Sequence, residues 1–117
     1  MEHFNLMEFD SPDVEGSGGL MDRGFLMKLD LARGNAGIPF KITSGYRTKE
    51  HNAKVGGVSD SSHTLGLAAD ISCSNSKDRL LIVSSLLRAG FSRIGIANTF
   101  IHVDLDYNKV QNVIWTY

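Results

Sequence analysis

The sequence of 117 residues lacks several features that would assign a class directly. Its single cysteine, Cys73, excludes an intramolecular disulfide and a metal cluster built from several cysteines. Its net charge of −1 leaves no basic excess to neutralise phosphates, which argues against a nucleic-acid partner. It contains no apolar run long enough to span a bilayer, so we expect no membrane partner either. With 42% apolar and 21% charged residues, the composition is that of an ordinary globular chain.

The start of the chain lacks the basic residues and apolar stretch of a signal peptide, so we expect synthesis in the cytoplasm. Action outside the cell would then need another agent of release. The length fits a single domain, residues 1–117, which can bury roughly two thirds of its unfolded surface. A Ser-Pro pair and a Gly-Ser-Gly-Gly run predict an irregular N-terminal segment over residues 1–19.

Apolar periodicity and turn residues predict an α+β fold. Residues 20–33 have apolar side chains at helical spacing, and Gly34 and Gly37 follow as stop signals. Residues 76–89 form the clearest helix, with Ser76 predicted as its N-cap. We expect a small, mostly antiparallel sheet with helices packed on one face and a site on the other. The remaining predicted elements are strands at 38–43, 67–73, 92–97 and 100–106, a short helix or turn at 46–55, and an edge strand at 112–117.

Three residues far apart in the sequence, His63, Asp70 and His102, could hold one zinc ion. Two imidazoles and one carboxylate leave a coordination position open, which is the arrangement of a catalytic zinc site. Taken alone, either histidine could be an ordinary polar residue. Asp70 lies in a strand of small apolar residues, however, where a buried carboxylate needs a partner or a metal. A straight strand would point His63 and Asp70 in opposite directions, so we expect the chain to turn at Gly66.

Longer motifs around these residues resemble the zinc D-Ala-D-Ala carboxypeptidases, a group that includes phage L-alanyl-D-glutamate endolysins. The motifs are Ile42-Thr43-Ser44-Gly45-Tyr46-Arg47-Thr48, then Asn52 and Gly56-Gly57, then the stretch from Ser62 to Asp70, and finally Phe100-Ile101-His102-Val103-Asp104. The resemblance covers residues 20–106, and the amino-terminal domain of Hedgehog proteins shares the fold. It implies a Hedgehog-like fold, zinc at His63, Asp70 and His102, and a peptide of peptidoglycan as substrate.

Arg47, just beyond a predicted strand end, is the next candidate. An arginine can bind a substrate carboxylate or stabilise the oxyanion that forms on attack, and the resemblance implies such a role here. A surface ion pair is the alternative. Ser62 could contact the substrate or support His63 from behind. Tyr46 could line the substrate pocket or pack in the core.

The general base is the least determined member of the predicted site. Many relatives carry an acidic residue three positions before the last histidine, and here that position is Thr99, which cannot accept a proton. Asp104 shares a strand face with His102, so it could accept a proton from the metal-bound water or orient the imidazole. Asp106 shares that face but lies farther along the chain.

We therefore expect a monomeric zinc peptidase that hydrolyses an amide bond in peptidoglycan peptides, next to a D-amino acid, as a carboxypeptidase or an endopeptidase. Such an enzyme would act on the cell wall after phage or prophage release, or in cytoplasmic recycling. Thr99 motivates an alternative, a non-catalytic zinc-containing module that binds the cell wall or a protein. A metal-free interaction domain is the third hypothesis. Cys73 and Trp115 are predicted to be packing residues, with His3 and His51 outside the site.

Overall fold

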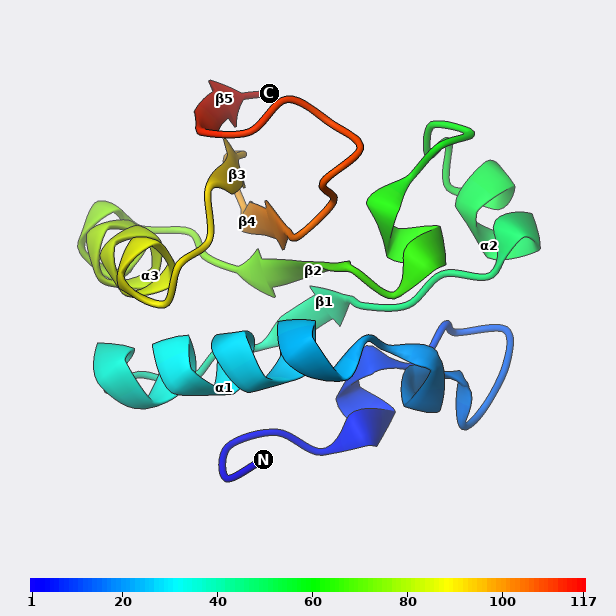
Figure 1. Cartoon of the computed structure of the whole chain (residues 1–117), viewed down its shortest axis with the longest axis horizontal. Helices are drawn as coiled ribbons and strands as arrows, with labels where there is room; N and C mark the ends of the chain where they lie inside the picture. The colour runs from blue at the N-terminus through cyan, green and yellow to red at the C-terminus, as the bar shows by residue number, and fades with distance from the viewer.

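A computed structural model describes residues 1–117, and a five-stranded sheet forms its centre (Figure 1). The strands are β1 (Ile42–Ser44), β2 (Ala68–Ser72), β3 (Arg93–Ile96), β4 (Phe100–Asp104) and β5 (Val113–Thr116), in the order β1-β2-β4-β3-β5. All neighbouring strands are antiparallel except β3 and β5, which are parallel. The predicted α+β fold with a mostly antiparallel sheet is confirmed.

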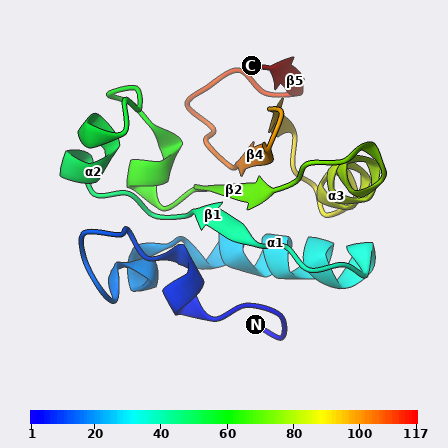
Figure 2. The ribbon, with the colours of Figure 1, turned by 180° about the vertical axis from the view of Figure 1, so that it is seen from behind.

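Two long helices, α1 (Arg23–Ala36) and α3 (Ser76–Arg88), pack together and contribute to one apolar core with the sheet. The short α2 (Lys49–Lys54) lies at the other end of the sheet from α3, as the front and back views agree (Figures 1 and 2). None of the helices combines the length and apolar character needed to cross a membrane. Core side chains from these elements include Phe25, Leu29, Ile82, Leu86, Ala69, Ile71, Ile94, Ile101 and Val103.

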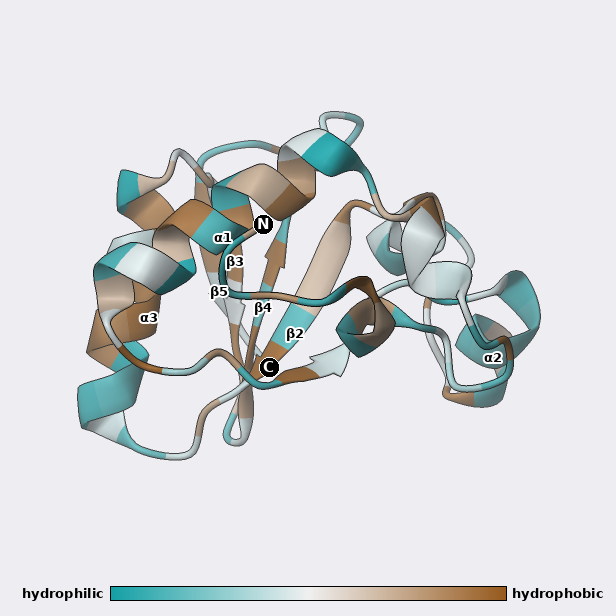
Figure 3. Cartoon of the chain, turned by 90° about the horizontal axis from the view of Figure 1, so that it is seen from below, coloured by the Kyte–Doolittle hydropathy of each residue, from teal (hydrophilic) through white to brown (hydrophobic).

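Alternation along the central strands separates an apolar face from a polar one. Ile71 of β2 and Val103 of β4 have no exposed surface and belong to the core. Asp70 in β2, and His102 and Asp104 in β4, occupy the alternate positions, which project to the other face. Figure 3 shows the result as hydrophilic stretches that interrupt hydrophobic ones within β2 and β4. The face of the sheet opposite the core therefore carries a line of polar groups.

Helix ends differ from their predicted positions because capping side chains outweigh single glycines. Helix α1 begins and ends three residues later than predicted, since the carboxylate of Asp22 accepts the first-turn amide at 2.9 Å. Gly34 stays inside the helix, and Gly37, with a φ of 70°, ends it. The N-cap of α3 is Asn75 rather than Ser76, because the Asn75 side chain accepts the amide of the third helical residue.

The N-terminal segment contains two short 3₁₀ helices, η1 (Leu6–Phe9) and η2 (Ser17–Leu20), within the stretch predicted to be irregular. A polar cluster fastens it to the start of α2. Asp13 accepts hydrogen bonds from the hydroxyl of Ser11 and, at 2.6 Å, from that of Thr48. These hydrogen bonds, first that from Ser11, hold the pKa of Asp13 below its ordinary value.

Candidate metal centre

One row of residues crosses all five strands on the polar face of the sheet. The register pairs Ser44 with Asp70, Asp70 with His102, His102 with Gly95, and Gly95 with Trp115. Directly opposed residues on neighbouring strands have their side chains on the same face and in contact range. The row therefore brings a carboxylate, an imidazole and an indole together, with a glycine between the imidazole and the indole.

His63, Asp70 and His102 converge as predicted. One possible ligand atom from each lies within 4.8 Å of the others, and all three residues are buried. Oδ1 of Asp70 is 3.3 Å from Nε2 of His63 and 2.9 Å from Nδ1 of His102. Bonds of about 2.0–2.1 Å to a tetrahedral zinc ion would separate neighbouring ligand atoms by about 3.3 Å. The donor set thus fits a single ion of this kind in both chemistry and spacing.

His63 reaches Asp70 because the chain turns sharply between them. Residues Ser62–Leu65 form a 3₁₀ helix, η3, which ends at Gly66 with a φ of 71°. A side chain there would be strained, and its Cβ would lie 2.5 Å from a backbone oxygen of η2. Nδ1 of His63 donates to the carbonyl oxygen of Gly45 at 2.8 Å, which leaves Nε2 for the metal side. The turn predicted at Gly66 is confirmed.

His102 is held on its other side by Asp104. Its Nε2–H donates to Oδ2 of Asp104 at 2.7 Å, so that Nδ1 faces Asp70. Oδ1 of Asp104 accepts from Nε of Arg93 at 2.7 Å and from the amide of Asp106 at 3.1 Å. Asp104 is 1% exposed, and both of its oxygens are engaged within the protein. Of the two roles that the sequence leaves open, this geometry matches the one that orients the imidazole.

In the site, hydrogen bonds between charged side chains shift pKa values in the direction opposite to burial. Burial alone would raise the pKa of Asp70, but hydrogen bonds from His102 and His63 hold it well below its ordinary value. Burial would lower the pKa of His102, yet its hydrogen bonds with Asp104 and Asp70 raise it above the ordinary value. Burial would also raise the pKa of Asp104, but hydrogen bonds from His102 and two further donors lower it. Both carboxylates are therefore ionised near neutral pH, whereas a metal ion would bind only as His102 gives up the proton that these contacts favour, since a ligating imidazole must be neutral.

Arg47 is fixed beside the metal candidates by three acceptors. Its Nε donates to Oγ of Ser44 at 2.9 Å, its Nη1 to Oδ1 of Asn52 at 3.3 Å, and its Nη2 to Oδ2 of Asp70 at 3.5 Å. The Asn52 amide fits only because Gly57 has no side chain, since a Cβ there would lie 2.0 Å from Oδ1 of Asn52. The guanidinium is thus held in place at the edge of the site, and the Arg47 side chain is only 16% exposed.

Ser62 lies in the wall of the site with its hydroxyl already engaged. Its Oγ donates to Oδ2 of Asp106 at 2.7 Å and accepts from Nζ of Lys109 at 3.2 Å. The residue is 3% exposed. These contacts tie the turn that carries His63 to the chain that follows β4, which is the supporting role considered for Ser62.

A cleft of about 420 Å³ opens over the three candidate ligands. The loop after α2 supplies one wall, with Val55 and Val58. The opposite wall contains Trp115 and Tyr117 from the end of the chain. Trp115 was expected to be a simple packing residue, but the centroid of its ring lies 5.6 Å from that of the His102 imidazole. A larger hollow of about 620 Å³ between the N-terminus and α1 gathers no comparable set of ligand atoms.

Several cleft residues were missed by the sequence analysis: Arg93, Lys109, Trp115 and Tyr117. The one sequence signal was Gly95, because a glycine inside a predicted strand often marks the close approach of another group. A Cβ at Gly95 would lie 2.6 Å from Nε1 of Trp115. The indole therefore occupies the space that the glycine leaves.

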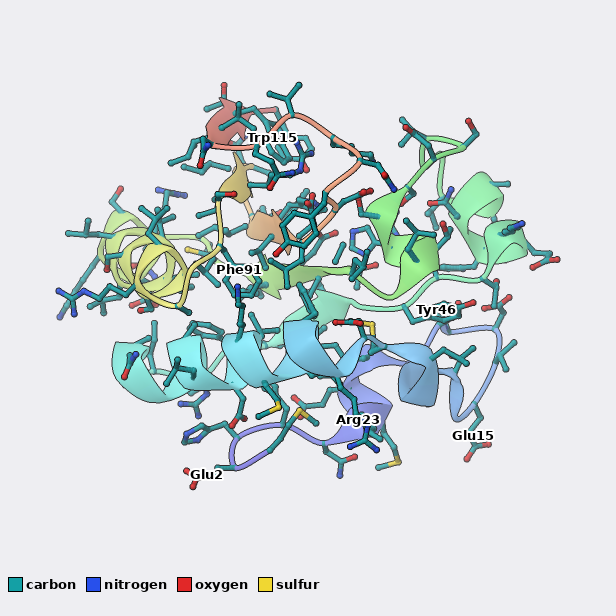
Figure 4. The ribbon with its side chains drawn as sticks, viewed as in Figure 1. Glu2, Glu15, Arg23, Tyr46, Phe91 and Trp115 are labelled. Carbon is teal, nitrogen blue, oxygen red and sulfur yellow. The ribbon has the colours of Figure 1, made fainter.

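Other candidates lie outside the cleft. Tyr46 packs against the apolar core and is not among the residues that line the cleft, which agrees with the second of the two positions that the sequence left open for it. Figure 4 shows Tyr46 at the level of β1, well apart from Trp115 above β4. Thr99 is exposed in the turn between β3 and β4. His3 and His51 do not join the cluster of possible metal ligands.

A buried set of metal ligands that opens into a cleft is typical of metal-dependent hydrolases. Comparison with family models narrows this class, since the model described as Peptidase M15 matches residues 2–104. The chain therefore belongs to the Peptidase M15 family, which makes it a metallopeptidase with a peptide as its substrate. The matched region includes His63, Asp70 and His102 and ends at Asp104. A comparison with curated proteins finds no match.

Proposed function

We propose that this protein is a zinc peptidase that hydrolyses an amide bond next to a D-amino acid in peptidoglycan peptides. The observation that carries the proposal is the convergence of His63, Asp70 and His102 beneath an open cleft in a chain of the Peptidase M15 family. The choice of peptidoglycan is supported by the Ser-Gly-Tyr-Arg and His-Val-Asp motifs, which resemble those of wall-cleaving zinc peptidases.

Each side chain then has a definite task. When bound, a zinc ion supplies a water activated near neutral pH and polarises the carbonyl under attack. His63 and His102 hold the ion through the ring nitrogens that face Asp70. Arg47, steadied by Ser44, stabilises the negative charge that develops on the carbonyl oxygen, or binds a substrate carboxylate.

The charge of the cleft favours an acidic peptide. The cationic groups Arg93 and Lys109 are each paired with a buried carboxylate, Asp104 and Asp106 respectively. Arg47 has only Asp70 as an ionic partner, at 3.5 Å, and that carboxylate is needed by the metal. A loaded site would therefore be net positive and would attract the carboxylates that peptidoglycan peptides carry.

Asp104 is assigned the orienting role in this proposal. Its two oxygens already serve His102 and Arg93, so a proton acceptor would have to give up one of these partners. Proton transfer to Asp104 stays a prediction, which the Asp104→Asn variant tests.

A non-catalytic zinc-binding module is the second candidate. The only carboxylates that line the cleft are Asp70 and Asp104, and both are engaged, so no free acid stands ready to accept a proton. Such a module would bind the same peptides and release no product.

One experiment separates the two candidates. The zinc-loaded protein is incubated with muropeptides of defined stem length, and the products are identified by chromatography and mass spectrometry. Released D-alanine indicates a carboxypeptidase, whereas a split within the stem or cross-link indicates an endopeptidase. His102→Ala should abolish cleavage, and His51→Ala, which changes a histidine outside the site, should not. Stoichiometric zinc with no cleavage of any peptide would favour the binding module.

A further inference from the structure

Arg93 connects three parts of the structure that meet behind the metal candidates. Its Nε donates to Oδ1 of Asp104 at 2.7 Å, and its Nη1 donates to the carbonyl oxygen of Val110. The centre of its guanidinium lies 5.0 Å from the ring centroid of Trp115. The side chain is only 11% exposed. A planar cation with these three contacts has little freedom to move.

Trp115 covers this guanidinium and the imidazole together. It is next to Gly95 in the cross-strand row, and Gly95 is next to His102. The missing side chain lets the indole lean over both groups, with its ring 5.6 Å from that of His102. The face of an indole attracts a cation, and the attraction is stronger when water is excluded.

We propose that Arg93, clamped against Trp115, is a positioning residue that fixes the imidazole of His102 through Asp104. Arg93 keeps one oxygen of Asp104 in place, so that the other must meet Nε2 of His102 and Nδ1 must face the ion. The clamp lies partly outside the region matched by the family model, because Trp115 follows residue 104. The inference rests on the proposed function in one respect, that His102 holds a metal.

Zinc affinity tests the clamp without any substrate. Competition with a chromophoric chelator gives the dissociation constant of Zn²⁺ for each folded full-length variant. Arg93→Gln and Trp115→Ala should weaken zinc binding about 10- to 100-fold, the usual effect of losing a group that orients a ligand. Trp115→Phe should recover most of the loss, because it restores an aromatic face. Arg93→Lys should recover little, because one ammonium cannot reproduce the planar fork.

A fifth variant makes the same test without removing any side chain. Gly95→Ala places a Cβ 2.6 Å from the indole of Trp115, so it should displace the ring and weaken zinc binding as Trp115→Ala does. The matched controls are Ile114→Ala, at the neighbouring position of β5 and 52% exposed, and Arg88→Gln, exposed at the end of α3. Neither control should change the affinity.

The ¹⁵N NMR signals of the His102 ring supply a readout that a purely structural role would leave unchanged. In the zinc-loaded wild type we expect one tautomer, protonated on Nε2, and in Arg93→Gln a broadened or mixed signal. Wild-type zinc affinity in folded Arg93→Gln and Trp115→Ala would overturn the proposal, as would weaker affinity with an unchanged His102 signal. If Arg93→Gln does not fold, the zinc affinities of Gly95→Ala and Trp115→Phe test the clamp instead. A wild type that binds zinc and cleaves no peptide would refute the peptidase and leave the clamp standing.

Discussion

Replacing Asp104 by asparagine distinguishes an orienting carboxylate from a proton acceptor. The substitution keeps the size of the side chain and removes its charge. The introduced amide can offer its single oxygen to His102 or to Arg93, whereas the carboxylate serves both at 2.7 Å. One charge-assisted hydrogen bond is therefore lost in a position that is 1% exposed.

The loss translates into a definite change in metal affinity. A hydrogen bond to a charged group contributes about 1.5–3 kcal/mol. Since about 1.4 kcal/mol corresponds to a factor of ten, Asp104→Asn should weaken zinc binding about 10- to 100-fold. Chelator competition measures the dissociation constant, and peptide cleavage at saturating zinc measures the remaining rate. If Asp104 only orients His102, saturating zinc should restore much of the activity.

A proton acceptor predicts the opposite pair of results. Zinc affinity would stay near that of the wild type, and kcat would fall about 10²- to 10⁴-fold even at saturating zinc. That outcome would refute the orienting role of Asp104. Asp60→Asn makes the same charge change at an exposed position and should alter neither quantity.

Three further predictions concern the support of the site and the fold. Gly57→Ala should displace the amide of Asn52 from Arg47 and lower kcat/KM on the order of 10- to 100-fold, with zinc affinity unchanged in a chelator assay. Leu29→Ala, at a core position with no exposed surface, should lower the free energy of unfolding by about 2–5 kcal/mol, measured by denaturant titration. The pKa of Asp13 is lowered by its hydroxyl donors, so its stabilising effect is present above the ordinary carboxylate pKa and is lost as pH falls through the folded value. The difference in Tm between wild type and Asp13→Asn should therefore shrink on acidification, and a constant difference would contradict this linkage.

Local patterns were sufficient to place Asp70 and His63 among the candidate metal ligands. Asp70 interrupts a strand of small apolar residues, and alternation alone assigns it to the face away from Ile71. Because His63 and Asp70 are an odd number of residues apart, the chain has to turn between them. Gly66 is the only glycine in this stretch, and it adopts a positive φ without strain. Both inferences use neighbours in the sequence, where geometry follows from the backbone.

The opposite wall of the cleft could not be predicted because it depends on strand order. Trp115 meets His102 only because β5 pairs with β3 in parallel, and this pairing places Gly95 between them. No local pattern specifies which strand an edge strand joins or in which register. The role of Arg93 could not be predicted either, because its partner Asp104 belongs to the neighbouring strand. An arginine is also expected to lie at the surface by default.

The position of the site residues within the sheet also bears on how the chain avoids misfolding. A slip of one residue between β2 and its neighbours would turn Asp70 toward Ile71's apolar surroundings and bring Ala69 out into the cleft. Burying an unpaired carboxylate among hydrocarbon groups is strongly unfavourable. The candidate metal ligands therefore penalise a sheet whose register is shifted by one residue, so they help to select the correct strand pairing during folding.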